Sequence, residues 1–428
     1  MRRRSPKQSR QCLSVVSGLL RYARNDKRDA VKNFVTHSEY RYSNFEFKYI
    51  MSSIVTEDIE TIATALRKEI GALEGKTILI SGGSGFLGSY FLAVLARLNS
   101  TEFKKPCKVI TLDNYVTGTR KNPLGDINDQ NFTFLKGDIC SPLKIDGPVD
   151  FIIHLAGIAS PVYYIKYPLE TIHTATIGTE NLLKLALLKK SKKFLFFSSS
   201  EIYGDPAPEF VPTPETYRGN VSSTGPRACY DESKRLGETL SMVYHSVHKV
   251  PIVIVRPFNV YGPGMKQEDR RVVPQFLSCA FAGKPLPIHG SGLQTRSYCY
   301  ITDAVVGFLK TLLTKQSGEV YNIGSHEGET NLVDLAKALE KLLKRKLIVA
   351  KIPYPPEYPA DEPSRRCPDL TKAKKELAYV PKVDLETGLR RIISWYESTY
   401  YEPSAAPKKN KQAHGKKYDR AKRRLGIR

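Results

Sequence analysis

The sequence is short of several features, and each absence argues against a class of protein. Its seven cysteines form no Cys-x-x-Cys pair and no spacing typical of a metal site. This scatter favours reduced thiols over a disulfide framework or a structural metal centre. No apolar run approaches the roughly 20 residues needed to cross a bilayer. We therefore expect a cytoplasmic protein with no metal site and no membrane span.

Acidic residues are also scarce relative to basic ones, and the imbalance lies mainly at the two ends of the chain. The formal net charge is +23. Residues 1–50 carry 12 basic and 4 acidic side chains, and residues 401–428 carry 10 and 2. Each end is therefore +8, which leaves +7 for the 350 residues between them. Nucleic-acid binding is thus expected only non-specifically, through the tails.

The two basic ends are expected to lie outside the folded body. Residues 1–50 allow three interpretations: an organellar targeting segment, a disordered basic arm, or translated sequence upstream of a true start at Met51. We favour the last, because the residues after Met51 resemble an ordinary N-terminus. Residues 403–428, Lys-rich after a Pro-Ser-Ala-Ala-Pro stretch, are predicted to be a disordered tail.

Between the tails, short apolar runs alternate with helical patterns. Strands are predicted over 76–81, 108–113, 131–138, 150–156, 193–199 and 251–257, with helices between them, one of them over 168–188. Continuous apolar strands separated by helices predict a parallel sheet covered on both faces. After residue 258 the segments shorten, with helices expected near 269–282 and 331–345. The fold class is therefore α/β: a Rossmann-type doubly wound sheet over 51–258, with a smaller mixed lobe over 259–402.

A glycine turn follows the first predicted strand. Gly82, Gly85 and Gly88 have the spacing at which a tight turn brings backbone N–H groups close to a pyrophosphate. Asp113 ends the second strand, where its carboxylate can hydrogen-bond a ribose diol and would repel a 2′-phosphate. The glycine turn therefore predicts a dinucleotide, and Asp113 favours NAD over NADP. Asp138, which ends the third strand, is either an adenine contact or a turn cap.

A tyrosine and a lysine follow the fifth strand. Tyr230 and Lys234 are four residues apart on a predicted helix, so they share one face. There the ammonium can lower the pKa of the phenol, which suits an acid/base working near neutral pH. Ser199, at the end of the fifth strand, can hydrogen-bond the hydroxyl being oxidised. Together with the glycine turn, this set predicts hydride transfer at an alcohol or ketone.

Eight stretches between about residues 76 and 400 carry a family resemblance. They are LDNYVTG (112–118), HLAGIASPVYY (154–164), SSSEIYGDP (198–206), RGNV (218–221), CYDESKRLGETL (229–240), FNVYGPGM (258–265), RVVPQF (271–276) and QTRSYCYITD (294–303). They resemble the extended short-chain dehydrogenase/reductases, specifically the UDP-glucuronate decarboxylases of the NAD-dependent epimerase/dehydratase family.

The resemblance implies an activity and an assembly. In that family NAD oxidises the sugar at C4, the resulting β-keto acid loses CO₂, and the retained NADH reduces the 4-ketone to give UDP-xylose. It also implies a homodimer that forms through helices near 167–189 and 228–247.

The resemblance also implies roles for individual residues. Tyr230 would be the acid/base, Lys234 its partner on the nicotinamide ribose, and Ser199 a hydrogen-bond partner of O4. Glu201 would act near C5 and the departing carboxylate, and Arg296 would orient that carboxylate. The implied cofactor-binding residues are Gly82, Gly85, Phe86, Leu87, Gly88, Asp113, Asn114, Gly118, Asp138, Ile139, Leu155, Ala156, Tyr230, Lys234 and Pro257, and the implied substrate-binding residues are Tyr164, Asn259, Arg271, Val273 and Arg296.

The chain departs from the family pattern at three positions. Ser199 stands where many of these decarboxylases have threonine, and either hydroxyl serves. Ala175 replaces a usual asparagine near the site. Arg218 replaces a usual tryptophan close to the expected substrate entrance, which bears on the choice of sugar.

Three other functions remain as alternatives. A nucleotide-sugar 4,6-dehydratase needs an acid for the departing 6-hydroxyl, and such enzymes resemble this chain but carry Asp-Glu where it has Ser200-Glu201. A 4-epimerase would leave Glu201 and Arg296 without a task. A non-catalytic nucleotide-sensing or RNA-binding protein would suit the basic tails, but it would have no need of Ser199, Tyr230 and Lys234.

Overall fold

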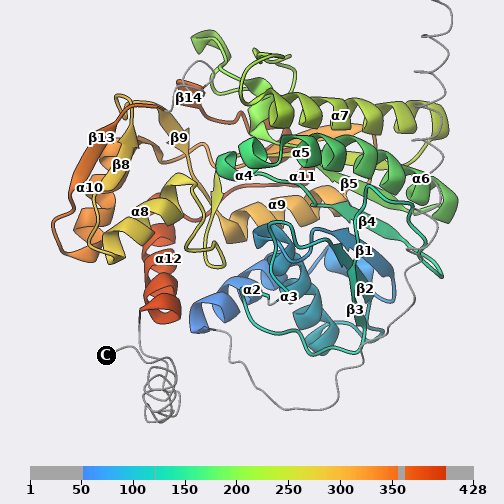
Figure 1. Cartoon of the computed structure of the whole chain (residues 1–428). Helices are drawn as coiled ribbons and strands as arrows, with labels where there is room; N and C mark the ends of the chain where they lie inside the picture. The colour runs from blue at the N-terminus through green and yellow to red at the C-terminus, as the bar shows by residue number, and fades with distance from the viewer. Residues whose placement is uncertain (1–51, 121, 355–361, 402–428) are drawn as a thin grey trace, which may run out of the picture. The chain divides into compact units, whose positions relative to one another are not determined.

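The computed structural model describes residues 52–120, 122–354 and 362–401 (Figure 1). The interpretations of residues 1–50 and 403–428 lie outside the described residues. Within the described ranges, no helix has both the length and the apolar character needed to cross a membrane.

A seven-stranded sheet forms the centre of the fold. Its order is β3-β2-β1-β4-β5-β6-β11, and every neighbouring pair is parallel. The predicted parallel sheet is confirmed. The strands are β1 (Thr77–Ser81), β2 (Lys108–Asp113), β3 (Phe132–Lys136), β4 (Phe151–His154), β5 (Lys193–Phe197), β6 (Ile252–Pro257) and β11 (Glu319–Ile323). The order reverses between β1 and β4, and ligands of such sheets lie beyond the carboxyl ends of the strands at that point.

Helices cover both faces of this sheet, which explains why β1, β4 and β5 are buried along their whole length (Figure 1). One face carries α2 (Ser53–Ala65), α3 (Phe86–Thr101) and α9 (Ile301–Leu313); the other carries α4 (Pro161–Lys166), α5 (Pro168–His173), α6 (Thr179–Lys189) and α7 (Ala228–His248). The helix predicted over 168–188 is therefore α5 and α6, joined by one turn of π-helix over Thr174–Gly178.

The seventh strand was not expected from the sequence. After β6 the chain enters the lobe and then returns through α9 to β11, which pairs in parallel with β6. The residues after 258 therefore contribute both to the smaller lobe and to the central sheet. Short apolar segments such as Glu319–Ile323 do not reveal by pattern alone which sheet they join.

The smaller lobe is built from short strands and helices. Its sheets pair β10 (Cys299–Tyr300) with β7 (Val260–Tyr261), β13 (Val349–Ile352) with β8 (Leu286–His289), and β12 (Glu329–Asn331) and β14 (Arg365–Arg366) with the central β9 (Thr295–Ser297). Its helices are α8 (Val272–Phe281), α10 (Leu332–Leu343), α11 (Thr371–Leu377) and α12 (Leu385–Tyr400). The pairing of β14 with β9 places Arg366 opposite Arg296, which brings together two cations 70 positions apart.

A buried carboxylate ties the lobe to the sheet layer. Asp58 of α2 accepts hydrogen bonds from the Tyr300 hydroxyl and the Arg391 Nη2, both at 2.8 Å. Because these partners lie on β10 and α12, the contact joins the first described helix to the last.

Candidate active site

A cavity of about 700 Å³ opens beyond the carboxyl ends of the strands, between the sheet and the lobe. Most of the residues singled out in the sequence line it: Gly82, Gly85, Phe86, Leu87, Gly88, Leu155, Tyr164, Ser199, Glu201, Tyr230, Lys234, Pro257, Asn259, Arg271, Val273 and Arg296. The other six, Asp113, Asn114, Gly118, Asp138, Ile139 and Ala156, lie at or just after the ends of β2, β3 and β4. Among the described residues, no cluster of three or more His, Cys, Asp or Glu side chains could hold a metal ion.

The glycine turn is too tightly packed for side chains. A Cβ on Gly82, whose φ is +77°, would lie 2.6 Å from the backbone nitrogen of Ala156, and one on Gly88 would lie 2.4 Å from the carbonyl oxygen of Gly82. Gly85 precedes α3, and no side chain caps that helix end. The N–H groups of the first turn of α3 therefore face the cavity side of the sheet with no competing acceptor, which fits a dinucleotide pyrophosphate.

The carboxylates after β2 and β3 are placed differently. Asp113 accepts hydrogen bonds from the backbone N–H groups of Ser84 (3.1 Å) and Tyr115 (2.8 Å), so it lies against the glycine turn where a ribose diol would be expected. Asp138 accepts from the N–H of Cys140 at 2.9 Å. That bond fits the cap interpretation of Asp138, and its adenine contact stays a prediction.

Tyr230 lies buried at the cavity wall. Its ring stacks on Tyr164 with the centroids 5.2 Å apart and the planes at 14°. Burial raises the pKa of Tyr230 to about 12, although a hydrogen bond with Ser199 opposes the rise. In the protein on its own, withdrawing the phenolate from water therefore outweighs the groups that would lower this pKa. The lowering of the Tyr230 pKa by Lys234 stays a prediction.

Lys234 is held by the end of β5. Its Nζ donates to the carbonyl oxygen of Phe197 at 2.8 Å and lies 6.0 Å from the centroid of the Tyr230 ring. Burial lowers the pKa of Lys234 to about 8. The ammonium thus remains mostly protonated at neutral pH, on the same side of α7 as the phenol.

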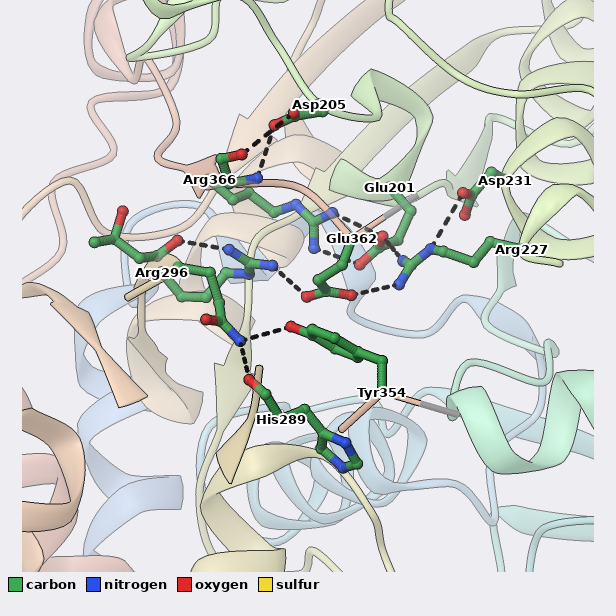
Figure 2. Close-up of polar contacts among 12 residues, drawn as sticks. Glu201, Asp205, Arg227, Asp231, His289, Arg296, Tyr354, Glu362 and Arg366 are labelled. Carbon is green, nitrogen blue, oxygen red and sulfur yellow. Dashed lines mark hydrogen bonds and ion pairs between the residues drawn. The ribbon is translucent and has the colours of Figure 1, made fainter. Parts of the chain in front are cut away.

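Glu201 is clasped by two arginines (Figure 2). Arg366 binds both of its oxygens, with Nη1–Oε1 at 2.5 Å and Nη2–Oε2 at 2.8 Å, and Arg227 donates to it as well. Burial alone would raise the pKa of Glu201, but the charges of Arg227, Arg366 and Arg296 hold it down at about 2. Glu201 is therefore held as a carboxylate at neutral pH.

The arginine cluster extends to two further carboxylates. Arg227 Nη1 lies 3.0 Å from Glu362 Oε2, and its Nε lies 3.5 Å from Asp231 Oδ2. Burial, and secondarily the charge of Glu201, raise the pKa of Asp231 to about 7. The second oxygen of Glu362 accepts from Arg296. The cluster is thus a chain of alternating charges along one wall of the cavity.

Sequence reasoning found Glu201 and Arg296 but gave no role to the other four members of this cluster, Arg227, Asp231, Glu362 and Arg366. Arg227 precedes α7 and lies only three residues before Tyr230, a proximity that could have drawn attention to it. Glu362 and Arg366 lie just before and at β14, whose pairing with β9 brings Arg366 to Glu201 and Glu362 to Arg296 and Arg227. No local pattern reports that pairing.

The remaining predicted substrate residues lie at the lobe side of the cavity. Arg271 is paired with Asp269, with Nε–Oδ2 at 3.0 Å, and its guanidinium lies 5.7 Å from the centroid of the Phe86 ring beside the glycine turn. Asn259 donates to the carbonyl oxygen of Ser297 at 3.2 Å. Their roles in binding substrate stay predictions.

The packing of the glycine turn generates a testable prediction. A Gly88→Ala variant should bind NAD at least tenfold more weakly by calorimetry, because its Cβ must push the backbone of Gly82 and Gly83 out of place. Gly71→Ala is the matched control, since a Cβ there meets nothing within 4 Å. Equal NAD affinity in both variants would remove the turn from cofactor binding.

Comparisons with known proteins agree with this geometry. Residues 78–324 match the model of the NAD dependent epimerase/dehydratase family. UDP-glucuronic acid decarboxylase 5 of Arabidopsis thaliana is 42% identical over 312 residues, 73% of this chain and 86% of that protein.

Two solved structures with NAD share the fold. A dTDP-glucose 4,6-dehydratase from Streptomyces venezuelae has a TM-score of 0.67 and 27% identity, covering 76% of this chain and 97% of that one. A UDP-glucuronic acid 4-epimerase from Bacillus cereus has a TM-score of 0.62 and 28% identity, covering 76% and 100%. With its glycine turn, Tyr230–Lys234 pair and parallel sheet, the chain belongs to the NAD-dependent epimerase/dehydratase family.

Proposed function

We propose that the protein decarboxylates UDP-glucuronate to UDP-xylose through oxidation at C4, loss of CO₂ and reduction of the 4-ketone. The observation that carries the proposal is the arginine cluster beside Tyr230, in which Arg227, Arg296 and Arg366 crowd one wall of the cavity. Guanidinium groups in that position suit a sugar that carries a carboxylate. The similarity to decarboxylases at 42% identity supports the same choice.

The first and last steps need a proton carrier at O4. NAD, held at the glycine turn and beside Asp113, would supply the hydride acceptor for oxidation at C4 and the hydride donor for the final reduction. Tyr230 takes the O4 proton and gives it back, and Ser199 orients the hydroxyl. Lys234 is protonated below about pH 8. Its positive charge lies on the buried side of α7 that also carries Tyr230, where it would favour the phenolate.

The middle step needs a fixed carboxylate rather than an acid. Once C4 is a ketone, the electrons of the breaking C5–carboxylate bond pass to C5 and the C4 oxygen as CO₂ leaves. The resulting enolate then takes a proton from water at C5, which restores the 4-ketone for the final reduction. Arg296 would hold the carboxylate out of the plane of the forming enolate, the orientation that this transfer requires. Glu201 would act as a permanent negative charge beside it, since its pKa of about 2 keeps it from delivering a proton.

The state of Glu201 also argues against the dehydratase alternative. Expelling a 6-hydroxyl requires an acid that is protonated at working pH. Neither Ser200 nor an ionised Glu201 provides one. Dehydratases carry Asp-Glu where this chain has Ser200-Glu201. The hydrogen bonds of Arg227 and Arg366 with Glu201 explain why the glutamate here stays ionised and cannot replace the missing acid.

We also propose a cytoplasmic homodimer. The helices expected to form the interface carry large exposed apolar side chains, Leu169 on α5 and Leu236, Val243 and Val247 on α7. The three on α7 are separated by seven and four residues, so they share one face of the helix. Such a stripe supports packing against a second copy of α5 and α7.

The proposed function is tested by proton NMR of the protein with UDP-glucuronate and NAD. UDP-xylose appearing without net NADH is the expected result. An epimerised UDP-uronate with its carboxylate retained would assign a 4-epimerase, and turnover of a nucleotide-linked glucose would assign a dehydratase.

A Tyr230→Phe variant should lower kcat at least 100-fold, because it removes the hydroxyl proposed to carry the O4 proton. NAD affinity, measured by calorimetry, should stay within a few-fold of wild type. Wild-type turnover in this variant would contradict the assigned role.

A Glu201→Gln variant should slow the steps after C4 oxidation by about 100-fold, since it removes the charge that Arg227 and Arg366 hold in place. Rapid-quench measurement of CO₂ release against NADH absorbance separates these steps. If CO₂ release were untouched, Glu201 would have no part in the chemistry.

A further inference from the structure

The guanidinium proposed to receive the substrate's carboxylate already has a carboxylate partner. Arg296 Nη2 is bonded to Glu362, while its Nη1 donates to the carbonyl oxygen of Thr295 at 2.8 Å (Figure 2). Glu362 and Arg296 both line the cavity. An incoming uronate therefore meets an occupied site rather than a free cation.

Burial makes the partner of Arg296 necessary. The side chain of Arg296 is 8% exposed, that of Arg227 is 5% exposed and that of Glu362 is 20% exposed. Burial and the charge of neighbouring Arg366 both lower the pKa of Arg296, so the guanidinium is costly to leave without an anion. Glu201 does not fill this place, because Arg366 and Arg227 hold both of its oxygens.

We propose that Glu362 is a resident competitor that the substrate's carboxylate displaces from Arg296. The inference rests on the proposed function and adds a residue that selects the substrate. Binding would exchange the carboxylate on Arg296 while Glu362 keeps its contact with Arg227 Nη1, so Arg296 is never left unpaired.

The exchange gives a reason for selecting uronates over neutral sugars. A sugar with a hydroxymethyl group at C5 has no charge with which to replace Glu362, so it gains no ion pair with Arg296. The exchange also favours product release. Once CO₂ has left, the pentose carries no carboxylate, and Glu362 returns to Arg296.

A charge-neutral variant tests the exchange. Glu362→Gln keeps the shape of the side chain and removes its charge, so UDP-glucuronate should bind on the order of tenfold more tightly. UDP has no sugar carboxylate, so its affinity for the Glu362→Gln variant should stay within twofold of its affinity for the parent protein. Calorimetry on NAD-loaded protein with Tyr230→Phe as the common background prevents turnover during the measurement.

The lobe offers a matched control. Glu329 has the same 20% side-chain exposure and binds a different arginine, Arg365, with Nε–Oε1 at 2.8 Å. It lies on β12, which pairs with β9. Glu329→Gln should leave the affinity for UDP-glucuronate unchanged, which separates displacement at Arg296 from a general loss of negative charge.

Two outcomes would overturn the proposal: unchanged affinity for UDP-glucuronate in Glu362→Gln, or weaker binding. If that variant fails to fold, Glu362→Asp keeps the charge with a shorter reach and should bind UDP-glucuronate at least as tightly as the parent; weaker binding would overturn the exchange. A wild type that binds both ligands but makes no UDP-xylose would refute the proposed function, and the affinity comparison would still decide the exchange.

Discussion

The arrangement of the site depends on one constraint: each buried charged side chain must be paired with a group of opposite charge. Arg227, Arg296 and Arg366 have side chains no more than 8% exposed, and an unpaired guanidinium in such a place would strongly destabilise the fold. Each therefore binds a carboxylate, and these pairs join the turn after β5, the start of α7, and strands β9 and β14. The same requirement that holds the lobe against the sheet also places three guanidinium groups, each paired with a carboxylate, where a uronate would bind.

Burial has opposite consequences for the two groups of the tyrosine–lysine pair. It raises the pKa of Tyr230 to about 12 and lowers that of Lys234 to about 8, because each charged form loses water. The protein alone therefore keeps the phenol neutral. The positive charge of an oxidised nicotinamide near this phenol would favour its ionisation.

The fold by itself leaves the reaction open. A dehydratase and a 4-epimerase, both solved with NAD, share the architecture with TM-scores of 0.67 and 0.62. The evidence for one reaction must therefore come from the site, where Arg227 and Arg366 bind the Glu201 carboxylate. Glu201 is kept ionised by its neighbours, so the cavity lacks a ready acid at that position.

The six N-terminal strands, the glycine turn and the Tyr230–Lys234 pair could be recognised from the sequence, because each rests on contacts between residues close along the chain: apolar runs, tight glycine spacing and the four-residue period of a helix. The sequence did not reveal the seventh strand, the raised pKa of Tyr230 or the partners of Glu201. β11 joins the sheet after a detour through the lobe, and Glu362 and Arg366 reach the cavity through one strand pairing near the end of the fold. Sequence thus determined the cofactor cradle and the catalytic pair, whereas tertiary structure decided the charge around them, since burial and long-range pairing set which carboxylates stay ionised.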